Sequence, residues 1–280
     1  MAKTLVVLNE SVDYNENLVR LIRALYNDVN HEHFEGMMVN DLATVNSISN
    51  HAGEPSLADF LPFKSDLLND DIKKKAEILS IFEEHAKESK ITYAINNDFR
   101  LNSHDLLKKT AYADLLMLNY TVFMNRSYRP NSSMIYSILK GSRCPVMVLP
   151  SDVGQIDNII FTFDGKESSM FAIRAFCNLF AETTKDKEIT ILTVMPSEDE
   201  EIENEKLLMD FVKKYYKNIG HQMLVGDNIS HEITNFAESV DNPLVVMGAY
   251  GRSRISNLFI PSTAKQFLIK GHIPLFIAHR

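Results

Sequence analysis

The stretch PSTAKQFLIKGHIPLFIAH, residues 261–279, occurs in this chain in a second, similar form, SSMIYSILKGSRCPVMVLP, residues 132–150. Each stretch contains a helical pattern followed by a proline and a short apolar run. The two prolines, Pro145 and Pro274, lie 274 − 145 = 129 positions apart. The same offset also aligns the apolar runs that precede the two stretches. An offset shared by strand, loop and helix indicates an internal duplication.

The second half of the chain alternates strand and helix patterns. Apolar runs at 158–163, 188–195, 221–225, 243–248 and 273–278 alternate with helical patterns at 167–182, 200–218, 229–239 and 262–270. Runs such as NPLVVMG are continuously apolar, as expected for parallel strands that are covered on both faces. Helix-length crossovers connect them. We predict an α/β fold with two tandem, doubly wound, parallel-sheet domains of the Rossmann-like type.

The two predicted domains are residues 1–150 and residues 151–280. The apolar runs that open them, Thr4–Glu10 and Ile159–Gly165, lie 159 − 4 = 155 positions apart, so the first copy has the longer interior. Its extra length falls around residues 41–90, where NHAGEPS is typical of a loop and DDIKKKAEILSIFEEHAKES of a charged amphipathic helix. We expect a helical insertion there.

Composition excludes several classes of protein. The chain has 280 residues, 45% of them hydrophobic and 24% charged, and no apolar run long enough to span a bilayer. Its start, MAKTLVVLNE, lacks the pattern of a signal peptide, and Cys144 and Cys177 have neither disulfide-framework nor zinc-site spacing. A formal net charge of −8 argues against nucleic-acid binding. We expect a cytoplasmic protein that binds neither membrane nor nucleic acid.

Candidate binding residues lie at the carboxyl ends of the predicted strands. In open parallel sheets ligands bind there, and Asp164 and Gly248 both end strand patterns. Glycines at 248 and 251 let the backbone turn tightly and present N–H groups to an anion. Ser262 and Thr263 begin a helix whose free N–H groups favour a phosphate. Together these residues predict a phosphate-binding crevice.

Each feature also has a structural explanation. The Gly248-x-x-Gly251 spacing alone is more often a turn than a phosphate cradle. Asp164 can cap the helix that follows it, because Asp-Gly after a strand is ordinary turn chemistry. Ser262 can cap its own helix with no phosphate present.

In these segments the chain resembles the universal stress protein family, in its tandem two-domain form. The segment IIFTFDGKESSMFAIRAF resembles the family's opening strand, acidic residue and first helix, and GDNISHEITNFAESVDNPLVVMGAYGRS its later helix, strand and phosphate loop. Nucleotide-binding members carry the signature G-x2-G-x9-G-[ST]. Gly248, Gly251 and Ser262 match it, and Pro261 stands where the third glycine is expected.

The resemblance implies an adenine-nucleotide site in the second domain. Asp164 would contact the nucleoside and accept hydrogen bonds from ribose, and Val194 would contact adenine through its backbone. Arg252 is in a position to meet a terminal phosphate, and ATP would bring Mg²⁺ with it. Pro261 has no N–H to donate, and losing one charge-assisted hydrogen bond costs about 1.5–3 kcal/mol, about a tenfold or greater weakening.

The first copy lacks these residues. At the matching positions Asn9 replaces Asp164, Asn119 replaces Gly248 and a valine, Val122, replaces the second glycine. We therefore expect a degenerate first domain, which lacks the phosphate-binding residues and has a structural or regulatory role.

We predict a stress-response protein that binds ATP in its second domain without turning it over. P-loop, dinucleotide and nucleophile-elbow motifs are absent, and no nucleophile is paired with a base. The alternatives are a pure protein-interaction module, with an unknown protein partner, and a slow ATP hydrolase. Family members pair through their last strands, so PVMVLP and IPLFIAH are expected to join the two domains as an intramolecular pseudo-dimer. Association into a homodimer is an additional expectation.

Overall fold

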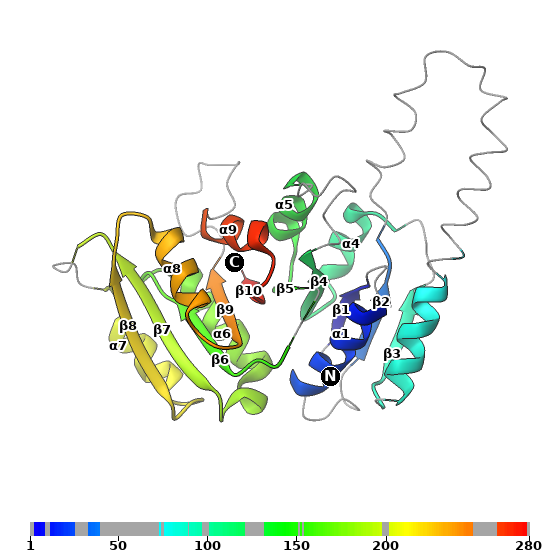
Figure 1. The fold of residues 1–280 in the computed structure, drawn as a ribbon, viewed down its shortest axis with the longest axis horizontal. Coiled ribbons are helices and arrows are strands. Elements are labelled where there is room, and N and C mark those ends of the chain that lie inside the picture. Colours follow the sequence, from blue (N-terminus) through cyan, green and yellow to red (C-terminus); the bar gives the residue numbers. More distant parts are fainter. Residues whose placement is uncertain are drawn as a thin grey trace, which may run out of the picture.

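A computed structural model of the protein describes most of the chain as one sheet with helices on both faces (Figure 1). The described residues are 3–8, 12–25, 33–39, 73, 76–88, 90–96, 101–120, 132–150, 152, 154–197, 202–248 and 262–278. Within this described part, none of the helices combines the length and the hydropathy that crossing a bilayer requires.

The strands are β1 (Lys3–Val7), β2 (His33–Met37), β3 (Tyr93–Asn96), β4 (Leu115–Asn119), β5 (Val146–Leu149), β6 (Asn158–Thr162), β7 (Glu188–Met195), β8 (Ile219–Val225), β9 (Pro243–Gly248) and β10 (Leu275–Ala278). The helices are α1 (Val12–Leu25), α4 (Ser103–Thr110), α5 (Ser132–Gly141), α6 (Glu167–Thr184), α7 (Glu205–Val212), α8 (Ile229–Glu238) and α9 (Ser262–Lys270). Residues 76–88 are also helical.

All ten of these strands belong to a single sheet, in the order β3-β2-β1-β4-β5-β10-β9-β6-β7-β8. Within each half the order from edge to centre is the third, second, first, fourth and fifth strand. Every described pair is parallel except β5 with β10. The predicted α/β class with doubly wound parallel sheets is confirmed, and the two halves share one topology.

The halves meet at their last strands, as the sequence predicted. β5 and β10 pair antiparallel, with Met147 opposite Phe276 and Val148 opposite Leu275. A buried hydrogen bond crosses the same junction, since the Tyr120 hydroxyl donates to the Ile273 carbonyl at 2.8 Å. The pairing gives each half's last strand a neighbour on both sides and leaves neither as a sheet edge.

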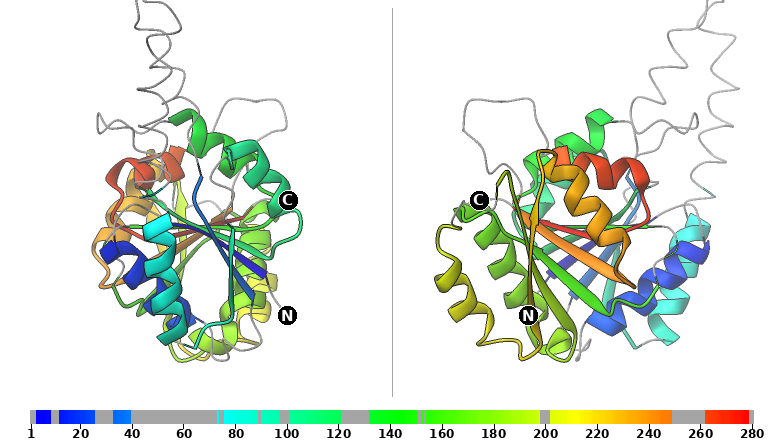
Figure 2. Two further views of the ribbon diagram at one scale, coloured as in Figure 1. Left: turned by 90° about the vertical axis from the view of Figure 1, so that its right-hand side faces the viewer. Right: turned by 60° about the vertical axis from the view of Figure 1, so that its left-hand side comes forward.

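Alternate side chains of the strands supply two cores, one on each face of the sheet. In β1, for example, Val6 points to one face while Leu5 and Val7 point to the other. The Val6 face is covered by α1, residues 76–88, α6 and α7, and the opposite face by α4, α5, α8 and α9. Figure 2 shows the two helical layers.

The helix at residues 76–88 has a counterpart in the second half. It lies between β2 and β3, as α7 lies between β7 and β8, and both pack on the same face. This helix is therefore a crossover of the repeated topology, and the extra length of the first half lies before it. Residues 40–72, which hold most of the expected insertion, lie outside the described residues. The domain limits 1–150 and 151–280 stay predictions.

One predicted helix was too long. The pattern at 200–218 predicted a single helix, but α7 spans only Glu205–Val212. Asn204 precedes it with a left-handed φ of 61°. After α7 the chain turns so that Tyr216 is buried, with its hydroxyl 2.9 Å from Thr184 Oγ1. Both features depend on contacts distant in sequence, which a local pattern does not encode.

A nearly buried carboxylate joins strands to a helix in the first half. Glu35, on β2, lies within 2.8 Å of both Lys3 Nζ and Lys109 Nζ and accepts a hydrogen bond from Asn96 Nδ2 at 3.1 Å. Burial alone would raise the pKa of Glu35. The hydrogen bonds from Lys109, Lys3 and Asn96 outweigh that effect and lower the pKa from 4.5 to about 2. The cluster connects β1, β2 and β3 to α4.

Candidate functional site

The predicted crevice lies at the carboxyl ends of β6 and β9. These strands are neighbours, and their connections leave in opposite directions, because β6 leads to β7 on one side and β9 to β10 on the other. Such a reversal of strand order is where open α/β sheets bind ligands. Asp164 follows the end of β6 and Gly248 ends β9. The sheet thus brings these two predicted residues to one crevice.

Asp164 holds the turn that leads into α6. Its Oδ1 accepts hydrogen bonds from the Lys166 backbone N–H at 3.2 Å and from the Ser169 hydroxyl at 2.7 Å. Its Oδ2 lies 3.8 Å from Lys166 Nζ. The side chain remains 48% exposed. The N-cap residue of α6 is Lys166, and no side chain caps the helix there, so the capping interpretation of Asp164 is wrong. Asp164 instead fixes the turn that leads into α6, and its Oδ2 remains accessible to a ligand.

The turn at Gly165 is fixed by its surroundings. Gly165 has a left-handed φ of 76°, and a Cβ there would lie 3.0 Å from the Glu203 carbonyl oxygen. Asn204 Nδ2 donates to the Gly165 carbonyl at 3.0 Å. The segment before α7 therefore supports the turn beside Asp164. The sequence indicated the turn through its Asp-Gly pair but not the support from residues 203 and 204.

Gly248 is required by packing rather than by a turn. A Cβ at this position would lie 2.5 Å from the carbonyl carbon and oxygen of Ser168 and 2.7 Å from the Ser169 nitrogen. These atoms belong to the first turn of α6. Only a residue without a side chain lets α6 approach the end of β9 so closely. This helix contact was not part of the prediction.

Val194 lies near the end of β7. The last paired residues of β6 and β7 are Thr162 and Leu192, so Val194 lies beyond the part of β7 that is paired with β6. On its other side it is paired with Leu224 of β8. Next to it, the Thr193 hydroxyl is buried and has no hydrogen-bond partner among the described residues. The end of β7 is thus free of strand pairing on the crevice side.

The amino ends of α8 and α9 lie together. The hydroxyls of Ser230 and Thr263, each in the first turn of its helix, are 3.1 Å apart. One turn further on, the Thr234 hydroxyl donates to Gln266 Oε1 at 3.2 Å. The start of α9 at Ser262 agrees with the predicted helix at 262–270. Two helix amino ends therefore converge near the end of β9.

The remaining predicted residues cannot be compared with the structure. Gly251, Arg252 and Pro261 lie outside the described residues, as do Asn9 and Val122 of the first copy. Asn119, the counterpart of Gly248, is fully buried at the end of β4. The nucleoside side of the predicted site is thus described, and most of its phosphate side is not.

Metal-ligating clusters are absent from the described part of the chain, where no three His, Cys, Asp or Glu side chains come together to hold an ion. Cys144 and Cys177 are both buried and free. Burial raises the pKa of the Cys144 thiol to about 11 and that of Cys177 to about 12. Neither thiol is therefore suited to act as a nucleophile.

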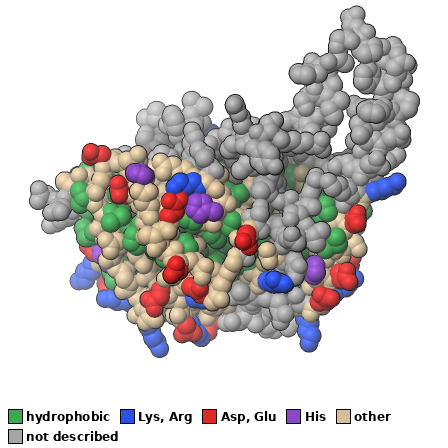
Figure 3. Space-filling view, in the orientation of Figure 1, with side chains coloured by type: hydrophobic (Ala, Val, Ile, Leu, Met, Phe, Trp, Pro, Cys, Tyr) green, Lys and Arg blue, Asp and Glu red, His purple; other side chains and the backbone are tan. Residues whose placement is uncertain are grey.

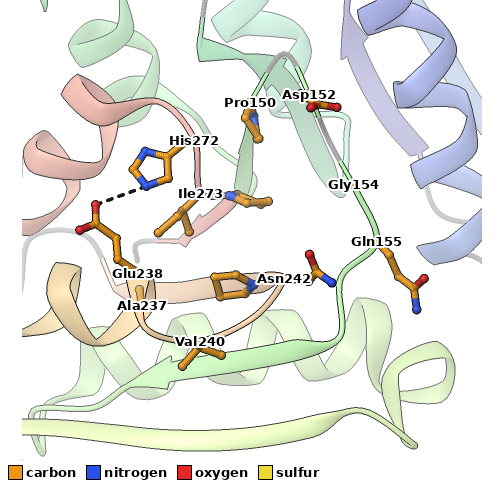
Figure 4. Close-up of a pocket in the computed structure, with 12 residues that line it drawn as sticks. Pro150, Asp152, Gly154, Gln155, Ala237, Glu238, Val240, Asn242, His272 and Ile273 are labelled. Carbon is orange, nitrogen blue, oxygen red and sulfur yellow. Dashed lines mark ion pairs between the residues drawn. The ribbon is translucent and has the colours of Figure 1, made fainter.

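The structure also contains a cavity of about 400 Å³ that the sequence did not predict (Figure 4). It lies at the amino end of β9, away from the predicted crevice. Its lining residues are Pro150, Asp152, Gly154, Gln155, Ala237, Glu238, Val240, Asn242, Pro243, His272, Ile273 and Pro274. His272 Nε2 lies 3.3 Å from Glu238 Oε1, which also pairs with Lys270. The residues come from segments far apart in sequence, including the end of α8 and the start of β9, so no local motif reveals the cavity.

Comparisons with known proteins agree with this architecture. The model of the Universal stress protein family matches residues 155–279. Universal stress protein Slr1230 of Synechocystis sp. is 27% identical over 140 residues. That match covers 49% of this chain and 48% of the relative, so the chain aligns with about half of the relative's length.

Two solved structures are similar over nearly the whole chain. A universal stress protein from Archaeoglobus fulgidus has a TM-score of 0.66 at 14% identity, covering 99% of this chain and 98% of that one. A functionally unknown protein from Pseudomonas aeruginosa has a TM-score of 0.59 at 11% identity, covering 100% of this chain and 92% of that one. At such identities the likeness is one of fold.

Proposed function

We propose that this chain acts as a member of the universal stress protein family, whose model matches residues 155–279, and that this second half binds an adenine nucleotide without hydrolysing it. The observation that carries the proposal is Asp164, whose side chain is 48% exposed at the reversal of strand order although it also accepts a hydrogen bond from Ser169 of α6. Nucleotide binding would then bias conformation or association in a stress response.

The described residues fit the nucleoside part of the ligand. Both hydrogen bonds that Asp164 accepts use its Oδ1, and the other carboxylate oxygen, Oδ2, is a strong acceptor for ribose hydroxyls. The backbone of Val194 extends beyond the pairing with β6, so it is available to the edge of an adenine ring. These two groups lie at the ends of adjacent strands, as a nucleoside would require.

The phosphate part depends on α9 and on the loop before it. The amino end of α9 offers free N–H groups and the positive end of a helix dipole. Gly251 and Arg252 would add backbone and side-chain donors. Pro261 removes one donor, so we expect affinity below that of a site with glycine there, by about tenfold or more. Mg²⁺ would be held mainly by the phosphates.

Thermal stability with and without nucleotide tests the proposal. A ligand that binds only the folded state raises the melting temperature, by the equivalent of about 1.4 kcal/mol at ten times its dissociation constant. We expect wild type to be stabilised by millimolar ATP with Mg²⁺ and, less strongly, by adenosine. Asp164→Ala should lose both responses. Gly251→Asp should lose the additional response to ATP and keep that to adenosine.

Ser169→Ala is the matched control. It removes the hydroxyl that donates to Asp164 Oδ1 and weakens the same turn, but it keeps the carboxylate. We expect lower basal stability with an intact nucleotide response. Absence of binding to wild type in equilibrium dialysis at millimolar ATP would refute the proposal. Phosphate release by wild type that Asp164→Ala abolishes would instead establish a hydrolase.

A further inference from the structure

β8 forms an exposed edge of the ten-stranded sheet. Five of its seven residues are exposed, and they include Met223 at 48% and Val225 at 50%. Figure 3 shows hydrophobic side chains on the left of the molecule, where Figure 1 places β7 and β8. The strand IGHQMLV contains no Lys, Arg, Asp or Glu. Its own residues therefore lack the permanent charges that commonly protect an edge strand from pairing, and a carboxylate beside it, that of Glu205, lies 3.0 Å from His221 Nδ1.

The other edge of the sheet is better protected. β3 has only four residues, all of them half-buried. The Tyr93 hydroxyl donates to Glu83 Oε1 at 2.9 Å, which ties the strand to the helix at residues 76–88. Asn96 donates to Glu35. The two edge strands, β3 and β8, hold equivalent places in the two halves, but β3 is shorter and less exposed than β8.

The backbone of β8 has one set of groups turned away from the sheet. At its two ends, Asn218 accepts and Gly226 donates a backbone hydrogen bond with β7. In a parallel pair, alternate residues of a strand bond to the same neighbour. The even-numbered residues of β8 thus face β7, and the N–H and C=O groups of His221 and Met223 point outward. These outward groups can accept one more strand.

A second copy of this chain fits that edge. In an antiparallel pairing centred on Gln222, Ile219 meets Val225 of the other copy and His221 meets Met223. Just beyond the strand, Lys217 meets Asp227 of the other copy, because 217 + 227 = 219 + 225 = 444. Both charged residues are exposed. We infer that two copies of the protein associate through β8 in this register, which brings two opposite-charge pairs together about a two-fold axis.

The chain already contains a junction of this kind. β5 and β10 join the two halves as an antiparallel pair within one sheet, and the same helical layers continue across it. A β8 pairing repeats that geometry between two copies. Strand pairing alone buries less surface than a permanent interface. We therefore expect a reversible dimer that forms as concentration rises and weakens as salt screens the charge pairs.

Sedimentation velocity on the full chain, from low micromolar to millimolar concentration, tests the inference. We expect the mass to rise from 31.9 kDa toward twice that value. Lys217→Asp or Asp227→Lys alone places like charges opposite each other at both ends of the ladder, so each should weaken association by about tenfold or more. The double variant with both changes restores opposite charges and should restore association.

Two further variants distinguish pairing through β8 from a general effect of charge or of misfolding on association. Met223→Pro removes an outward N–H without removing a bond to β7, and proline is tolerated on edge strands, so it should abolish dimers and keep the circular dichroism spectrum. Lys73→Asp changes net charge by the same amount as Lys217→Asp, at an exposed lysine of the first half, and should leave association unchanged. A wild type that stays monomeric at millimolar concentration would overturn the inference. So would a dimer that Met223→Pro and the charge reversals leave intact.

Discussion

Gly248 and Asp164 each combine a structural role with a predicted binding role. Gly248 lets the first turn of α6 lie against β9, and Asp164 accepts a hydrogen bond from Ser169 in that same turn. The geometry of the crevice therefore depends on α6 being held in place from two sides. A residue that looks like part of a ligand motif can owe its identity to packing, and the two roles are separable by substitution.

Gly248→Ala should destabilise the protein by about 1–3 kcal/mol, because its new Cβ would lie 2.5 Å from backbone atoms of Ser168 and force α6 to move. Urea unfolding followed by circular dichroism measures the change. Gly154→Ala is the control, since a Cβ there meets nothing within 4 Å. Equal stability of the two variants would contradict the packing explanation.

Element boundaries were predictable where local signals are strong. β7, β9 and α9 were predicted at the residues where they occur, because continuous apolar runs and helical periodicity end at clear turn residues. α7 was predicted too long because its limits depend on Asn204 and Tyr216, whose conformations are set by distant contacts. Likewise, no local pattern encodes the approach of α6 to Gly248.

The cluster around Glu35 gives the first half a pH-dependent connection between β2 and α4. The pKa of Glu35 is lowered to about 2 in the folded protein from an ordinary value of 4.5. This lowered pKa adds up to about 3 kcal/mol to the free energy of unfolding. That contribution is fully present above pH 4.5 and is lost as the pH falls toward 2. We expect Glu35→Gln to lower the unfolding free energy at neutral pH and to reduce the loss of stability across this interval. Urea unfolding at pH 4.5 and near pH 2 measures the two losses. If wild type and Glu35→Gln lost equal stability between these pH values, the role of Glu35 would be contradicted.

At the scale of the whole molecule, both hydrophobic cores draw residues from both halves of the chain. One core, for example, includes Val6 and Leu18 as well as Phe176 and Phe276. The continuous sheet and the shared cores predict that the halves unfold together. The Tyr120 hydrogen bond to Ile273 is one of the contacts that couple them.

Tyr120→Phe should therefore lower the free energy of unfolding of the entire protein by about 1–3 kcal/mol, because a buried carbonyl loses its donor. Burial also raises the pKa of the Tyr120 hydroxyl, so it remains a donor through neutral pH. Urea unfolding should keep a single transition with a lower midpoint. Tyr112→Phe, at a side chain 81% exposed, should change little. Two separate transitions, only one of them shifted, would contradict coupled unfolding.

The antiparallel junction of β5 with β10 has a consequence for how this protein can evolve. In a symmetric dimer of identical chains, every substitution appears on both sides of the axis. Here the two sides are encoded separately, so Asn119 in β4 and Gly248 in β9 can differ although they hold equivalent places. Selection can thus act on each half separately, so that a residue required in one half need not be kept in the other.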